Sequence, residues 1–214
     1  MNQHIPRILG RLASLLLACG AVAGAAPAQE APAPATPATT VAVVMHTTLG
    51  DIHVALEAQR APITVANFLR YVDGRRFDNA TFYRAVKVGP DDLYGLVQGG
   101  VKGGDPKKLF PPIAHESPAA TGLSHVDGTI SMASEDPGTA TADFFFIIGD
   151  LTTLDGKADG TDPGYAAFGH VTQGMDIIRQ ILKLPRSETE GEGVMKGQML
   201  ADAVKILSIR RLDR

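Results

Sequence analysis

The feature that most constrains the fold is the shortness of the apolar runs, which from Val41 onward are separated by turns rich in Gly and Pro. Every second residue from Ile52 to Leu56 is large and apolar, and this two-residue period is typical of a half-buried β-strand. We expect Val41–Thr48 to be its partner, joined to it by a tight turn at 49–51. A further strand is predicted at Val204–Arg210, where the chain closes.

Two segments have the period of an α-helix instead. Apolar residues of the first recur at i, i+3, i+4 and i+7, with Pro62 near its start and Gly74 just past its end. They are Val65, Phe68, Leu69 and Val72. The second helix covers about Gly174 to Leu184 and is ended by Pro185. Many short strands with two helices predict one β-rich domain, whose closed or sandwiched antiparallel sheet is capped by the helices.

Length and charge narrow the class of protein. A chain of 214 residues fits one domain and a tail. Hydrophobic residues make up 44% and charged residues 20%, which is ordinary for a soluble globular protein. The formal net charge of −3 provides no basic surface of the kind that binds nucleic acid or anionic lipid. We therefore expect no nucleic-acid partner.

The first 28 residues have the pattern of a secretory signal peptide. Arg7 and Arg11 precede the apolar run 12–18, and small residues follow it. That run is too short to cross a bilayer, which takes about 20 residues. We predict export to the periplasm, with cleavage after Ala26 or after Ala28.

The single cysteine, Cys19, leaves two forms of the mature N-terminus open. The run 16–19 (Leu-Leu-Ala-Cys) resembles a bacterial lipobox, in which the cysteine is lipidated; alternatively, Cys19 is a small apolar residue in a discarded signal. Residues 29–40 are rich in Ala and Pro and predict a disordered spacer, followed by the folded domain at 41–214. We expect a monomer that meets the membrane only if Cys19 is lipidated.

Most motifs of catalytic chemistry are missing. The sequence has no Gly-x-Ser-x-Gly elbow, no Gly-x-Gly-x-x-Gly, no phosphate loop and no His-Glu-x-x-His. The histidines lack ligand spacing, and lone histidines are usually surface or core residues. Glu135 and Asp136 precede Pro137-Gly138, so turn formation explains them better than paired acid catalysis. We expect neither a cofactor nor a metal ion.

What remains is a set of residues without a nucleophile. Arg84 follows two aromatic residues, Gln98 ends a short apolar strand, and residues 144–146 are three phenylalanines in a chain without tryptophan. A plainer interpretation accounts for each of them as a surface charge, a strand end and a piece of core. Taken alone, the residues favour that plainer interpretation.

In their order along the chain, eight segments between Val41 and Leu212 resemble the cyclophilin family. They are Thr47-Thr-Leu-Gly-Asp-Ile52, Ala61-Pro-x-Thr-Val-x-Asn-Phe68, Phe82-Tyr-Arg84, Gln98-Gly-Gly100, Gly128-Thr-Ile-Ser-Met-Ala133, Ala142-Asp-Phe-Phe145, Leu154-Asp-Gly156 and Ala167-Phe-Gly169. The resemblance implies a mainly-β fold, an eight-stranded antiparallel β-barrel capped by two α-helices. It also implies peptidyl-prolyl cis-trans isomerase activity.

The implied reaction needs no nucleophile. Its barrier is the partial double bond of the peptide link, about 18–20 kcal/mol, so an enzyme need only bind the twisted amide better than the planar one. In the family an arginine donates to the prolyl nitrogen as resonance is lost, and Arg84 matches that arginine. Gln98 matches the glutamine that hydrogen-bonds the carbonyl region of the substrate.

The resemblance also assigns a binding pocket. Phe145 matches the family's pocket phenylalanine, Leu154 matches a pocket leucine, and Leu96 stands where a methionine is common. Ala133 and Ser134 match positions that contact the backbone preceding the proline.

Three positions depart from the family pattern. Asp143 stands where glutamine is usual and Tyr165 replaces the usual histidine. Gly95 occupies the place of a common phenylalanine, so we expect one wall of the pocket to be lost. We expect Asp143 and Tyr165 to lie in the binding site all the same.

Two functions follow from these residues. The first is an isomerase that assists the folding of exported proteins by acting on X-Pro bonds in unfolded or loop segments. The second is a catalytically weak proline-peptide binding or chaperone module of the cell envelope, for which Asp143 and Gly95 are the motivation.

Overall fold

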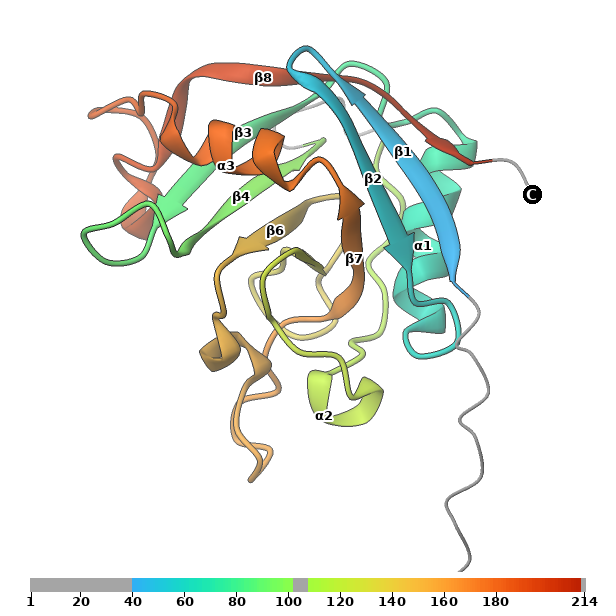
Figure 1. Ribbon diagram of the computed structural model, residues 1–214. Helices are drawn as coiled ribbons and strands as arrows, with labels where there is room; N and C mark the ends of the chain where they lie inside the picture. The colour runs from blue at the N-terminus through green and yellow to red at the C-terminus, as the bar shows by residue number, and fades with distance from the viewer. Residues whose placement is uncertain (1–39, 102–107, 213–214) are drawn as a thin grey trace, which may run out of the picture. The chain divides into compact units, whose positions relative to one another are not determined.

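The computed structural model describes residues 40–101 and 108–212, and eight strands within them close into one antiparallel barrel (Figure 1). The order around the barrel is β1-β2-β7-β5-β6-β4-β3-β8, and β8 pairs back onto β1. The strands are β1 Val41–Thr47, β2 Gly50–Leu56, β3 Ala80–Lys87, β4 Gly95–Gly100, β5 Thr129–Met132, β6 Phe144–Ile148, β7 Ala167–Gln173 and β8 Met199–Arg211. The predicted mainly-β fold class and the eight-stranded antiparallel barrel are confirmed.

The first hairpin turns one residue earlier than the pattern predicted. Because β1 ends at Thr47 and β2 begins at Gly50, the turn consists of Thr48 and Leu49. The Thr47 hydroxyl closes it by donating to the Gly50 carbonyl oxygen at 2.7 Å and accepting from the Leu49 N–H at 3.1 Å. A side chain that bonds its own backbone decides the turn, which apolar alternation does not reveal.

The two predicted helices are present as α1, Pro62–Asp73, and α3, Met175–Lys183. They lie on different sides of the barrel in Figure 1, and apolar residues of both belong to one buried core. The structure adds a third helix, α2, Pro118–Thr121, and the 3₁₀ turns η2, Thr152–Asp155, and η3, Gly193–Met195. Elements of three or four residues are too short to show a helical period, so the sequence pattern did not predict them.

Aromatic rings fill the barrel. The Phe144 ring meets the rings of Phe68, Phe77, Phe82 and Phe146 edge-on, with centroids 5.5 to 6.1 Å apart. All five side chains are fully buried or nearly so. Edge-to-face pairs of this kind add to the gain from burying the rings. Since Phe68 belongs to α1, the cluster also fastens that helix to the barrel.

The N-terminal predictions cannot be compared with this structure. The predicted signal peptide at 1–28, Cys19, and all but the last residue of the predicted spacer at 29–40 lie outside the described residues. Among the described residues, no helix has both the length and the apolar character needed to cross a membrane.

Candidate active site

A row of residues crosses neighbouring strands of the barrel. Met199 of β8 pairs with Arg84 of β3, Arg84 with Gln98 of β4, Gln98 with Phe145 of β6, and Phe145 with Ser131 of β5. Residues directly opposite one another on paired strands project from the same face of a sheet. The ladder therefore aligns side chains that are more than 100 positions apart in the sequence.

A β-bulge in β3 gives two adjacent side chains the same direction. Phe82 pairs with Gly99 and Arg84 pairs with Gln98, so Tyr83 is the extra residue. Neighbouring residues of a regular strand point to opposite faces, but a bulge interrupts that alternation. Phe82 fills the core, while Tyr83 and Arg84 both line a cleft on the outside.

The cleft has a volume of about 760 Å³. It is formed by strands β3, β4 and β6 together with the segments around η2, η3 and the end of β5. All nine residues predicted for the site line it. They are Arg84, Leu96, Gln98, Ala133, Ser134, Asp143, Phe145, Leu154 and Tyr165.

Two glutamines hold the Arg84 guanidinium. Its Nη1 donates to Gln98 Oε1 at 2.7 Å, while its Nε and Nη2 donate to Gln198 Oε1 at 2.9 and 2.6 Å. Burial lowers the pKa of Arg84, but the usual pKa of arginine is so high that the group stays charged at neutral pH. These bonds use three of the five N–H donors, so one N–H on each of Nη1 and Nη2 is not used by the glutamines.

Phe145 forms an apolar wall of the cleft. Strand alternation turns it away from the core that Phe144 and Phe146 fill. Its ring stacks on His125 with centroids 6.0 Å apart and meets Tyr165 edge-on at 5.5 Å. Rings on two sides fix the orientation of the Phe145 side chain.

The model of the family "Cyclophilin type peptidyl-prolyl cis-trans isomerase/CLD" matches residues 42–211. The chain belongs to the cyclophilin family. It is 34% identical to a peptidyl-prolyl cis-trans isomerase of Acinetobacter baylyi over 169 residues, which cover 78% of this chain and 84% of that protein. It is 36% identical to peptidyl-prolyl cis-trans isomerase A of Dickeya dadantii over 165 residues, 75% of this chain and 80% of the relative.

Solved structures of the family share the fold. A cyclophilin-type isomerase of Cryptosporidium parvum superposes with a TM-score of 0.64 at 21% identity, covering 82% of this chain and 99% of the other. The same Cryptosporidium parvum protein, determined in the presence of the dipeptide Ala-Pro, superposes with a TM-score of 0.63 at 22% identity and covers 81% of this chain. At this identity the likeness concerns the fold alone.

Gly95 lies outside the cyclophilin cleft. A Cβ atom at this position would approach the Val86 carbonyl oxygen to 2.3 Å and the Leu182 side chain to 2.9 Å. The position therefore faces the backbone of β3 and helix α3, and a larger side chain has no room there. The glycine permits close packing of α3 on the barrel, so it does not remove a wall of this cleft.

The sequence reasoning missed several residues that complete the cyclophilin cleft. Tyr83 was part of a motif but had no role, and Gln198 had no signal because only the pairing of β3 with β8 brings it to Arg84. Val194 and Met195 of η3 also line the cleft. The apolar pair Val194-Met195 within the polar run 186–198 is the signal by which the sequence could have revealed them.

A buried polar chain supports the apolar wall from behind. His125 is fully buried, and its ring nitrogens contact Asp155 Oδ1 at 2.6 Å and Ser131 Oγ at 2.9 Å. Ser124 also bonds the Asp155 carboxylate. The order Ser-His-Asp is that of a hydrolase triad, but Ser131 is fully buried and no substrate can reach it. The chain holds His125 in place beneath Phe145.

His125 should make the folded state sensitive to mild acid. Burial lowers the pKa of His125 more than the hydrogen bond and the charge of Asp155 raise it, so the unfolded chain takes up this proton first as the pH falls. Unfolded histidine titrates near pH 6.5, so the free energy of unfolding should fall as the pH decreases from about 7.5 to 5.5. Thermal unfolding at several pH values measures this.

His125→Gln is the control for that measurement, since the variant has no group at this position that titrates in the same range. We expect its unfolding temperature to depend less on pH between 7.5 and 5.5 than that of the unaltered chain. Equal slopes in the two proteins would contradict the assignment to His125.

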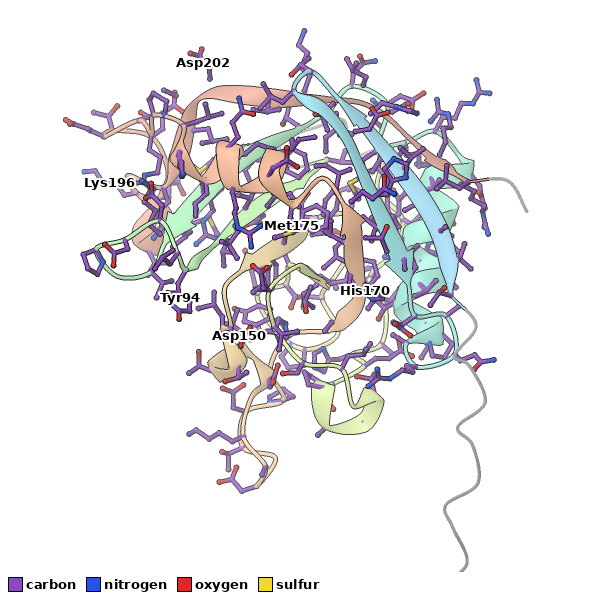
Figure 2. The ribbon with its side chains drawn as sticks, in the orientation of Figure 1. Tyr94, Asp150, His170, Met175, Lys196 and Asp202 are labelled. Carbon is purple, nitrogen blue, oxygen red and sulfur yellow. The ribbon has the colours of Figure 1, made fainter. Side chains whose placement is uncertain are left out.

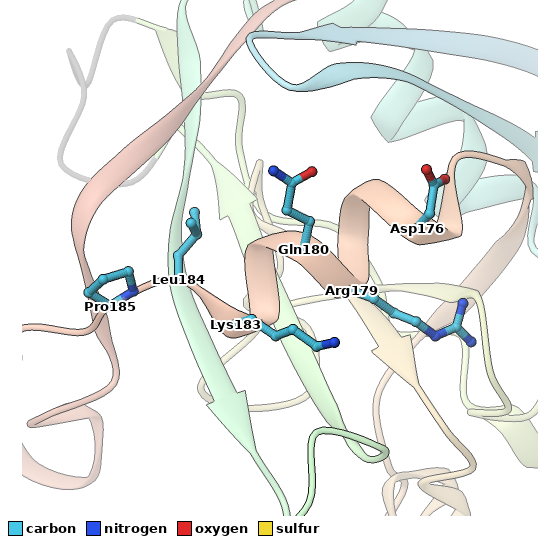
Figure 3. Close-up of a pocket in the computed structure, with 6 residues that line it drawn as sticks. All are labelled: Asp176, Arg179, Gln180, Lys183, Leu184 and Pro185. Carbon is cyan, nitrogen blue, oxygen red and sulfur yellow. The ribbon is translucent and has the colours of Figure 1, made fainter.

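A second hollow of about 530 Å³ lies along α3 (Figure 3). Asp176, Arg179, Gln180 and Lys183 of the helix line it together with Leu184 and Pro185. The four polar side chains extend outward from the helix in different directions and do not converge on one point. In the described parts of the chain, no group of three or more His, Cys, Asp or Glu residues could hold a metal ion.

Proposed function

We propose that this cyclophilin isomerises X-Pro bonds of exported proteins and that Arg84 is its electrostatic catalyst. The observation that carries the proposal is a charged guanidinium held by two carboxamide oxygens at one end of a cleft whose wall is apolar. A donor fixed in advance, with free N–H groups, stabilises charge as it develops without reorganising.

The reaction follows from the amide group itself. In planar X-Pro the nitrogen lone pair is delocalised into the carbonyl, and rotation localises it on nitrogen. A donor at that nitrogen therefore binds the twisted amide more strongly than the planar one, which is the requirement for catalysis. No proton is transferred and no covalent bond forms or breaks. We assign the donation to the two N–H groups of Arg84 that the glutamines leave free.

The apolar wall suits the proline ring. Leu96, Phe145 and Leu154 line the cleft and offer contacts without hydrogen bonds. We propose that the ring rests on Phe145 while the preceding residue rotates near Ala133 and Ser134. The determination of the Cryptosporidium parvum relative in the presence of Ala-Pro supports a proline-containing ligand.

Exchange spectroscopy on an Ala-Pro-Phe peptide tests this function against the binding-module alternative, for which Asp143 in the cleft remains the motivation. We expect catalytic amounts of the chain to speed exchange between the cis and trans NMR peaks far beyond the uncatalysed rate, which has a time constant of tens to hundreds of seconds or so. Shifted peptide peaks without faster exchange would favour the binding module.

Export is a separate part of the proposal and has its own test. The pattern of residues 1–28 supports a signal peptide, and the full-length chain can be produced in a bacterium with a periplasm. Mass spectrometry of the mature N-terminus should find a start near Pro27 or Gln29, or a lipidated Cys19. An intact Met1 in the cytosolic fraction would overturn export.

A further inference from the structure

Gln98 has a fixed direction in this cleft. Its Oε1 faces Arg84 at 2.7 Å, and its Nε2 donates to the Tyr83 hydroxyl at 2.8 Å. A carboxamide turned by 180° would present its NH₂ group to the guanidinium, so that donor would face donor. Whatever fixes the outer end of the Gln98 amide therefore decides whether Arg84 is held or repelled.

Tyr83 links the Gln98 carboxamide to Asp143. The Tyr83 hydroxyl is hydrogen-bonded to Asp143 as well as to Gln98. Because the Tyr83 oxygen accepts from Gln98 Nε2, its own proton is left to be donated to the Asp143 carboxyl group. The pKa of Tyr83 is raised, chiefly by burial and then by the Asp143 charge, so the hydroxyl keeps the proton that this arrangement requires.

The backbone accommodates this chain of hydrogen-bonded side chains at two places. The bulge in β3 turns Tyr83 to the same side as Arg84. A Cβ atom at Gly100 would lie 2.2 Å from Asp143 Oδ1, so only glycine lets the carboxylate occupy that place. Gly100 also has a φ of +142°, which other residues rarely adopt.

We propose that Asp143 is a positioning residue, which acts through Tyr83 and Gln98 to present a carbonyl oxygen to the Arg84 guanidinium. Gln198 holds the other side of the same group through the Nε and Nη2 donors. The proposal rests on the proposed function of Arg84 and deepens it. Asp143, which departs from the family pattern, thereby becomes part of the machinery that orients the catalytic arginine.

The test breaks the hydrogen-bond chain at Tyr83 and, separately, at Asp143. Tyr83→Phe deletes the hydroxyl, and Asp143→Leu deletes the acceptor with a somewhat larger side chain that branches at the same atom. Each should lower kcat/KM on an Ala-Pro-Phe peptide roughly fivefold, the size expected when one orienting hydrogen bond is lost. Asp143→Asn keeps an acceptor oxygen and should restore most of the activity.

A second readout reports the position of Arg84 directly. The Arg84 Nε–H signal in a ¹⁵N spectrum is expected to be sharp and protected from solvent exchange in the unaltered chain, because Nε donates to Gln198. In Tyr83→Phe and Asp143→Leu it should broaden or shift, whereas a loss of stability alone would leave it in place. An unchanged Nε–H signal in both variants would overturn the proposal.

Matched controls use the same residue types outside the cleft. Tyr94 lies in the connection between β3 and β4, and Asp202 lies on the outer side of β8 (Figure 2). Both side chains are exposed, so Tyr94→Phe and Asp202→Leu should leave kcat/KM and the Arg84 signal unchanged.

Combining each variant with Arg84→Ala separates this proposal from the proposed function. If Asp143 acts through Arg84, Asp143→Leu should cause no further loss in the Arg84→Ala background. A further fivefold loss there would overturn the positioning role. If Arg84→Ala alone is as fast as the unaltered chain, the proposed function is wrong, and the Nε–H signal still decides whether Asp143 orients the guanidinium.

Discussion

Replacing Arg84 by alanine is expected to lower kcat by roughly two to three orders of magnitude, the effect typical of removing a donor that serves the transition state. The donation is needed only when the amide twists, so kcat should fall much more than KM rises. The fold should survive because Arg84 is only partly buried and lies outside the core. A protease-coupled assay over a range of Ala-Pro-Phe peptide concentrations measures both constants.

Arg84→Lys sharpens this result. Lysine keeps the charge but presents a compact ammonium, which cannot span Gln98 and Gln198 with separate, fixed donors. We expect a rate between those of Arg84→Ala and the unaltered chain. Full activity of the lysine variant would show that charge alone is sufficient and that the geometry of the guanidinium is not needed.

Arg179→Ala is the matched control for both variants. Arg179 lies on α3 away from the cleft and forms an exposed ion pair with Asp127 at 2.6 Å. Exposed pairs contribute at most about 1 kcal/mol, so kcat and stability should change little. If Arg179→Ala and Arg84→Ala reduced the rate equally, the proposed role of Arg84 would be contradicted.

Replacing Phe144 by alanine is expected to destabilise the fold by about 3–5 kcal/mol, since it opens a cavity where four other rings meet. For a domain of this size that corresponds to a fall of about 10 °C in the unfolding temperature. Thermal unfolding followed by circular dichroism measures it. The activity at low temperature, where the variant is still folded, should stay close to that of the unaltered chain.

The neighbouring residue provides the comparison. Phe145→Ala removes the same atoms from the next position of β6, where the ring faces the cleft instead of the core. We expect kcat/KM to fall roughly tenfold or more, because the proline ring loses its apolar contact surface. Its effect on stability should be smaller than that of Phe144→Ala. The assignment of the two faces is wrong if Phe144→Ala impairs activity more and Phe145→Ala impairs stability more.

The periodic elements of the fold were open to prediction because their cause is local. Residues 62–74 show a helical apolar face with Pro and Gly at the expected ends, and α1 occupies 62–73. The alternation from Ile52 to Leu56 became β2 for the same reason. The turn of the first hairpin and helix α2 were missed, since a single hydroxyl or a four-residue element leaves no periodic trace.

The residues of the site were predicted better than the contacts between them. Resemblance to the family named Arg84, Gln98 and Phe145 because motifs preserve the order of residues along the chain. It could not name Gln198 or explain Tyr83, since the first depends on the pairing of β3 with β8 and the second on a bulge. Gly95 was assigned to the wrong surface, because only packing against α3 shows which way that position faces.

The sequence by itself determined the class of fold, the two longer helices and nine of the residues that reach the cleft. These properties follow from periodicity and motif order, which depend only on the order of residues along the chain. Only the tertiary structure decided which groups hydrogen-bond one another. The hydrogen-bond chain from Asp143 through Tyr83 and Gln98 to Arg84, completed by Gln198, joins strands β3 and β4 to the segments just before β6 and β8. Hydrogen bonds act over about 3 Å, so they depend on strand register and on one bulge, which no spacing in the sequence specifies.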